Sequence, residues 1–84
     1  MTRMNERIWE RVSLAFRSCA PIEERLVFLG GVELFIQVCR APAVWKPAAM
    51  VIQMRLEEPG MTQTQTFSSL EQARDTLEKW RNRI

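Results

Sequence analysis

Two adjacent glycines, Gly30 and Gly31, separate two runs of residues that favour β-strands. The runs are Leu26-Val27-Phe28-Leu29 and Val32-Glu33-Leu34-Phe35-Ile36-Gln37-Val38. Glycine adopts without penalty the positive φ that both central positions of a type I′ turn require, so this arrangement predicts a β-hairpin. One alternative stays open for residues 21–29: a short helix that begins near Pro21 and ends at Gly30.

A two-residue turn at the glycines determines which side chains share a face of the hairpin. It pairs Leu29 with Val32 and leaves Leu26, Phe28 and Phe35 together on one face. A sheet with helices on one side is expected to be polar on the other, so these apolar side chains need a cover. The cover is a helix that crosses to this face, a second copy of the chain, or another protein. The opposite face is the predicted core face, with Val27, Leu29, Val32, Leu34 and Ile36.

Two further strands are predicted after this hairpin. Residues 49–57 alternate apolar and polar side chains, as in a half-buried strand, and Pro59-Gly60 then turns the chain. Residues 61–67 read as a polar strand that suits a sheet edge. Its register is open, because pairing of Glu58 with Met61 puts the glutamines on the core face, whereas a three-residue loop puts the threonines there.

Helices are predicted at both ends of the chain. Residues 4–19 carry apolar side chains at helical spacing, and Pro21 closes the segment. Ser68-Ser69-Leu70-Glu71 is a capping box in which Ser68 accepts from the Glu71 amide. We therefore predict one α+β domain over residues 1–84, with an antiparallel sheet of three to four strands flanked by an N-terminal and a C-terminal helix in α-β-β-β-β-α order. The last helix has a predicted apolar stripe of Leu70, Ala73, Leu77, Trp80 and Ile84.

The residue types exclude most enzyme chemistries. The chain has no histidine, and its two cysteines, Cys19 and Cys39, lack C-x-x-C spacing. Histidine is the commonest general base and metal ligand near neutral pH, so a cysteine nucleophile would lack its usual base. Adjacent carboxylates such as Glu23 and Glu24 point to opposite faces of a strand and cannot act as a pair. We expect no enzyme activity, no metal and no cofactor.

Charge and hydropathy bear on the expected partners and on the expected cellular compartment. The formal net charge of +2, from 12 basic and 10 acidic residues, is too small to imply nucleic acid by itself. No apolar run reaches the ~18 residues of a membrane span, and the interleaved arginines and glutamates of the N-terminus are not a secretory signal. With two reduced thiols, we expect a cytoplasmic protein without a membrane partner.

The expected function is binding. We expect a small non-catalytic protein-binding module, a stoichiometric inhibitor or accessory subunit of a larger assembly, in the style of accessory proteins of phages and plasmids. The partner is another protein, a second copy in a homodimer through the hairpin face, or both. Exposed aromatic and apolar side chains act as anchors in such interfaces. The candidate contact residues are Leu26, Phe28 and Phe35 in the hairpin, with Trp9, Leu14 and Trp45 as further anchors.

Nucleic-acid binding is the alternative expectation. Arginines recur on one side of the N-terminal helix, and basic residues end the C-terminal helix. Such side chains contact phosphates along a nucleic-acid backbone. The candidate residues for this function are Arg3, Arg7, Arg11, Arg81 and Arg83.

Overall fold

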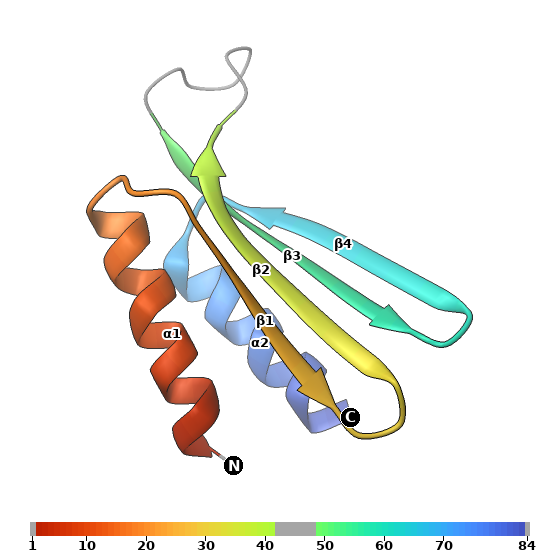
Figure 1. Cartoon of the computed structure of the whole chain (residues 1–84). Helices are drawn as coiled ribbons and strands as arrows, with labels where there is room; N and C mark the ends of the chain where they lie inside the picture. The colour runs from red at the N-terminus through yellow and green to blue at the C-terminus, as the bar shows by residue number, and fades with distance from the viewer. Residues whose placement is uncertain (1, 42–48, 84) are drawn as a thin grey trace.

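The computed structural model describes the backbone of residues 2–41 and 49–83 and the side chains of residues 6–41 and 49–82. Four strands form one antiparallel sheet in the order β1-β2-β3-β4, with a helix before and a helix after them (Figure 1). The predicted α+β class and the α-β-β-β-β-α order are therefore confirmed. The elements are α1 (Thr2–Arg17), β1 (Ile22–Phe28), β2 (Val32–Arg40), β3 (Met50–Glu58), β4 (Met61–Phe67) and α2 (Leu70–Arg83).

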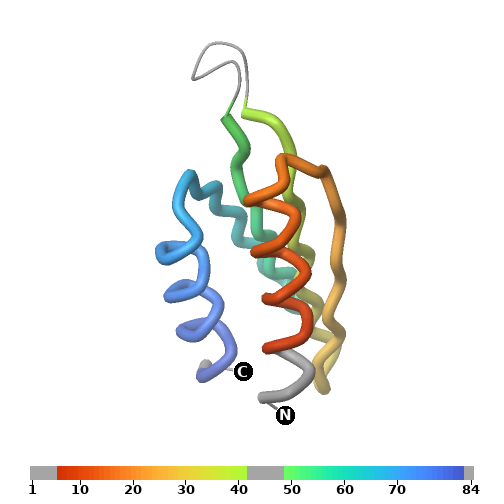
Figure 2. Tube along the Cα trace, turned by 90° about the vertical axis from the view of Figure 1, so that its left-hand side faces the viewer, coloured from red at the N-terminus to blue at the C-terminus, as the bar shows by residue number. Residues whose placement is uncertain are grey.

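Both helices pack on the same face of the sheet, as the edge-on view shows (Figure 2). The core lies between this face and the helices. Alternate residues in the central parts of β2 and β3 are buried there, and Val12 of α1 and Ala73 of α2 are fully buried against them. The apolar stripe predicted for the last helix is confirmed for its described members, because Leu77 and Trp80 are buried and Leu70 packs against the core. The strand residues of the core include Leu34, Ile36, Val38, Ile52, Met54 and Leu56.

Neither helix of the described part of the chain lies on the opposite face of the sheet, which is called the open face below (Figure 2). Its side chains belong to the strand residues that alternate with the core residues. Most of them are polar or charged, as expected for the solvated side of an antiparallel sheet. They are Glu23, Arg25, Val27, Glu33, Phe35, Gln37, Cys39, Val51, Gln53, Arg55, Glu57, Thr62, Thr64 and Thr66.

The β1–β2 turn contains three residues, Leu29-Gly30-Gly31, rather than two. Phe28 pairs with Val32, and Leu26 pairs with Leu34. Both glycines have positive φ, 82° and 78°, as a glycine turn requires. The extra turn residue moves β1 by one position against β2, and a slip of one residue sends every side chain to the other face.

The predicted faces of β1 are consequently wrong. Leu26 is 5% exposed and belongs to the core, whereas Val27 is 66% exposed on the open face. The alternative of a short helix over residues 21–29 is also wrong, because Ile22–Phe28 is a strand. Glu23 and Arg25 lie on the same face as Val27, whereas Glu24 lies on the helix side opposite Ile36.

The β3–β4 turn has two residues, Pro59 and Gly60, and Glu58 pairs with Met61. Proline followed by a glycine with φ of 81° is the pattern of a type II turn. This register is the first of the two alternatives left open by the sequence, and it puts Gln63 and Gln65 on the helix side. The predicted edge position of this strand is confirmed by the strand order.

A Schellman motif ends α1 before Pro21. Cys19 has a φ of 56°, in the left-handed region. Its amide donates to the Phe16 carbonyl at 3.4 Å, and the Ala20 amide donates to the Ala15 carbonyl at 2.9 Å. These bonds satisfy carbonyls of the last turn that have no partner inside the helix. The helix therefore ends at Arg17, two residues before the predicted end.

Ser69, not Ser68, caps α2. The Gln72 amide donates to Ser69 Oγ at 3.4 Å, and the Ala73 amide donates to the Ser69 carbonyl at 3.2 Å. The predicted capping box is therefore displaced by one residue. The reason is that Phe67, paired with Ile52 in the sheet and buried, keeps the chain extended to the end of β4.

Candidate functional site

A row of side chains crosses the open face, with Phe35 of β2 at its centre. Arg25 of β1 and Arg55 of β3 are the cross-strand partners of Phe35, and Arg55 also pairs with Thr64 of β4. The guanidinium carbons of Arg25 and Arg55 lie 5.6 Å and 4.5 Å from the centroid of the Phe35 ring. Because the ring face is negative, it attracts a guanidinium at this distance. The two arginines therefore cover the half-buried ring.

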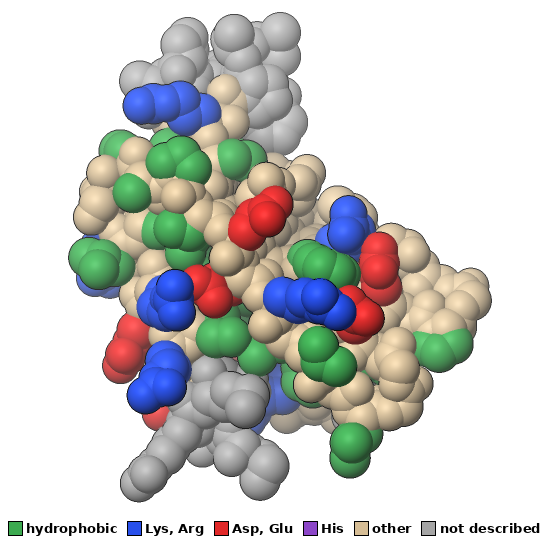
Figure 3. All heavy atoms as spheres, viewed as in Figure 1, with side chains coloured by type: hydrophobic (Ala, Val, Ile, Leu, Met, Phe, Trp, Pro, Cys, Tyr) green, Lys and Arg blue, Asp and Glu red, His purple; other side chains and the backbone are tan. Residues whose placement is uncertain are grey.

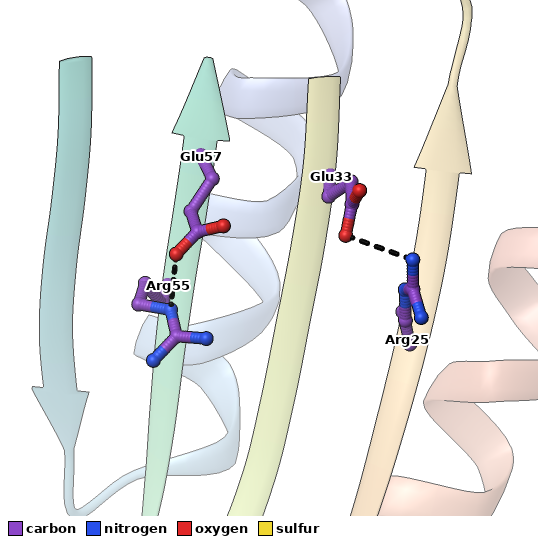
Figure 4. Close-up of polar contacts among 4 residues, drawn as sticks. All are labelled: Arg25, Glu33, Arg55 and Glu57. Carbon is purple, nitrogen blue, oxygen red and sulfur yellow. Dashed lines mark ion pairs between the residues drawn. The ribbon is translucent and has the colours of Figure 1, made fainter. Parts of the chain in front are cut away.

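Two glutamates hold these arginines in place (Figure 4). Arg25 Nη2 lies 3.1 Å from Glu33 Oε1, and Arg55 Nε lies 3.0 Å from Glu57 Oε2. Glu33 and Glu57 are themselves opposite each other on β2 and β3, an arrangement that repels unless each charge is compensated. Exposed ion pairs of this kind stabilise a fold by only about 0–1 kcal/mol. In this arrangement each guanidinium contacts both a carboxylate and the ring. These five residues are called the Phe35 cluster below.

Exposed apolar side chains lie at the turn end of the open face. Val27 is the neighbour of Glu33 across the strands, and Leu29 in the turn is 95% exposed. The two hairpin turns approach each other, since a Cβ on Gly31 would lie 3.7 Å from Pro59 Cγ. In the space-filling view of this face, hydrophobic side chains lie among basic and acidic ones (Figure 3). Val27 and Leu29 were predicted for the core, and the length of the turn is what displaced them.

On its other side, the Phe35 cluster borders a shallow polar hollow. Gln37 Nε2 donates to Glu23 Oε2 at 3.3 Å across β1 and β2. The rest of the lining is formed by Glu24, Arg25, Phe35, Ile36, Gln53, Arg55 and Thr64. The ring thus has hydrogen-bonding groups on one side, while Val27, opposite Glu33, and Leu29 lie toward the turn.

The structure separates the predicted contact residues of the hairpin. Leu26 is buried in the core, and Phe28 lies on the helix side, half-buried against the core. Neither is available on the open face, because the three-residue turn reverses β1. Phe35 alone of the three lies there.

The predicted anchors outside the hairpin do not join Phe35. Leu14 of α1 is 66% exposed and does not belong to the core. Trp9 is half-buried and lines a groove between the helices with Leu77 and Arg81. Both lie on the helix side of the sheet. Trp45 lies outside the described residues.

Two of the three basic residues predicted for nucleic-acid binding whose side chains are described form ion pairs. Arg7 is exposed on α1, but Arg11 Nε lies 3.1 Å from Glu24 Oε2 of β1. Arg81 Nη2 lies 2.8 Å from Glu78 Oε1 on α2. A guanidinium paired with a carboxylate contributes less to phosphate binding than a free one. The side chains of Arg3 and Arg83 lie outside the described residues.

The two cysteines are free thiols, with Cys19 exposed and Cys39 half-buried. Neither described helix is long and apolar enough to cross a membrane. Comparison of the chain with protein-family models, with curated proteins and with solved structures finds no match.

Proposed function

We propose that this chain is a non-catalytic protein-binding module whose contact surface is the Phe35 cluster together with Val27 and Leu29. The observation that carries the proposal is an aromatic ring between two guanidinium groups, on a sheet face that neither α1 nor α2 covers. Aromatic residues and arginine are enriched in protein interfaces and among their hot spots. The adjacent exposed apolar turn adds surface that gains from exclusion of water.

The ion pairs of the cluster support this proposal further. Binding costs entropy when long side chains become ordered, and the ion pairs with Glu33 and Glu57 favour conformations of Arg25 and Arg55 in which the guanidinium groups lie over the ring. A guanidinium has five N–H donors, and each of these ion pairs engages one donor nitrogen. The other donors suit carbonyl or carboxylate oxygens of a partner. We infer a protein partner with an apolar patch for Val27 and Leu29, bordered by such oxygens.

The mode of action belongs to the same proposal. The absence of histidine from the sequence favours binding over catalysis. A small domain that acts by occupying a surface suits a stoichiometric inhibitor or an accessory subunit of a larger assembly. The two free thiols support a reducing, cytoplasmic location.

The test is site-specific photo-crosslinking followed by affinity measurement. A photo-reactive amino acid at position 27 captures the partner, which is then identified and purified. Binding of that partner is measured by calorimetry for the wild type, Val27→Asp and Leu29→Asp. We expect both variants to lose at least about tenfold in affinity, because each puts a charge in the apolar part of the contact.

Leu14→Asp is the matched control. Leu14 and Val27 have the same exposure, 66%, but lie on opposite sides of the sheet. We expect this variant to bind like the wild type. If Leu14→Asp abolishes binding and Val27→Asp does not, the contact surface lies on the helix side and the proposed surface is wrong.

A further inference from the structure

The two edges of the sheet, β1 and β4, differ in how they are protected. β1 carries three consecutive charged residues, and one of them, Glu24, forms an ion pair with Arg11 of α1 at 3.1 Å. Charged side chains and covering elements are the usual protection of a sheet edge. Met61–Phe67 of β4 contains neither a charged residue nor a proline. Among the described elements, none lies along the outer edge of β4 (Figure 1).

The register of the β3–β4 hairpin identifies the backbone groups on this edge. Glu58 and Met61 close a two-residue turn, and such a closing pair exchanges both backbone hydrogen bonds. Hydrogen-bonded and non-hydrogen-bonded pairs then alternate along the strands. The amides and carbonyls of Thr62, Thr64 and Thr66 therefore point away from β3, toward the free edge.

The sequence of β4, Met-Thr-Gln-Thr-Gln-Thr-Phe, reads nearly the same in both directions about Thr64. A two-fold interface brings the same surface of two copies together, so it requires a surface that is complementary to itself. An antiparallel pair of β4 strands centred on Thr64 places Thr62 opposite Thr66. It also places Gln63 opposite Gln65 and Met61 opposite Phe67.

We propose that two copies of this chain associate through β4, antiparallel and centred on Thr64, so that their four-stranded sheets become one continuous sheet. Pairing about Thr64 places like side chains opposite each other. The same pairing brings the outward amides and carbonyls of one strand opposite those of the other. Each threonine pair then exchanges both backbone hydrogen bonds. The proposal is independent of the function proposed for the Phe35 cluster.

The side chains of β4 suit this arrangement on both faces. Thr62, Thr64 and Thr66 form a cross-strand ladder on the open face, where threonine pairs are favourable. On the helix side, Met61, which is 46% exposed, lies opposite Phe67 of the other copy. A two-fold axis perpendicular to the sheet keeps the helices of both copies on one side. Both Phe35 clusters then lie on the other side.

The experiment is light scattering coupled to size exclusion over a concentration series, with a pair of charge variants. In Thr62→Lys/Thr66→Lys, like charges face each other at both ends of the proposed interface. In Thr62→Lys/Thr66→Glu, opposite charges face each other in the same places. We expect a wild-type dimer, a dimer dissociation constant raised about tenfold or more in the first variant, and little change in the second.

Two controls keep the result interpretable. Circular dichroism and thermal unfolding test whether both variants are folded. We expect that they are, because the substituted threonines are exposed on an edge strand. Val27→Asp, on the open face away from β4, is expected to remain dimeric. A wild type that is monomeric at every concentration overturns the proposal, and so does a Thr62→Lys/Thr66→Lys protein that dimerises like the wild type. A dimer that is lost in Val27→Asp places the interface on the open face and also overturns it.

Discussion

Arg55 lies over the ring of Phe35, with its Cζ 4.5 Å from the ring centroid, while its Nε lies 3.0 Å from Glu57 Oε2. The guanidinium of Arg55 thus contacts both an aromatic ring and a carboxylate. Phe35 and Arg55 are direct cross-strand partners in the middle of the sheet, so the contact links β2 and β3 on the side that the core does not reach. An apolar side chain is in this way half-covered without a helix.

The Arg55–Phe35 contact is expected to stabilise the fold measurably. We predict a coupling free energy of about 0.5–1 kcal/mol between the two side chains. The measurement is a double-mutant cycle of Arg55→Ala and Phe35→Leu by urea unfolding, since leucine keeps an apolar side chain but removes the ring. A coupling energy of zero would mean that the geometry contributes nothing to stability.

The observed register predicts opposite behaviour for two neighbouring residues. Leu26→Ala is expected to lower the free energy of unfolding by about 2–4 kcal/mol, because it leaves a cavity in the core. Val27→Ala is expected to change it by no more than about 0.5 kcal/mol, because Val27 is largely exposed. Chemical denaturation of both variants measures the difference. If the turn had two residues, as the sequence predicted, Val27→Ala would be the more destabilising of the two substitutions.

The position of the α2 cap is tested by two adjacent serines. Ser69→Ala removes the oxygen that accepts from the Gln72 amide, and we expect a loss of about 1 kcal/mol. Ser68→Ala removes a hydroxyl from an exposed residue before the cap, and we expect stability within about 0.5 kcal/mol of the wild type. Thermal unfolding of the two proteins compares them directly. Equal losses would contradict the assignment of Ser69 as the cap.

Cys19 is expected to be a site where glycine stabilises the protein. Its φ of 56° is costly for any residue with a Cβ. We predict that Cys19→Gly raises the free energy of unfolding by about 0.5–1 kcal/mol, after the greater entropy of glycine in the unfolded chain is subtracted. Cys19→Ala keeps the Cβ and serves as the control in urea unfolding. If alanine stabilises as much as glycine, the backbone conformation is not the cause.

The candidate site was predictable from the sequence only in part. Phe35 is on the open face in either register of the hairpin, because it belongs to β2, whose faces the prediction had right. Leu26 and Val27 are both large and apolar, so the hairpin sequence alone does not determine which of the two side chains is buried in the core. The cover of Phe35 by Arg25 and Arg55 was not predicted, since it depends on the pairing of three strands.

The sequence by itself determined the local structure of this protein. Apolar spacing, glycine and proline positions and a serine cap act within a few residues of each other, so the helices, the strands and their order follow from them. Register was decided only in the tertiary structure, because one additional turn residue costs little locally but determines which side chain of each neighbouring pair is buried against the helices. The same long-range pairing placed Glu33 opposite Glu57 and Phe35 between Arg25 and Arg55. Contacts between strands distant in sequence depend on packing of the whole chain, and no local pattern specifies them.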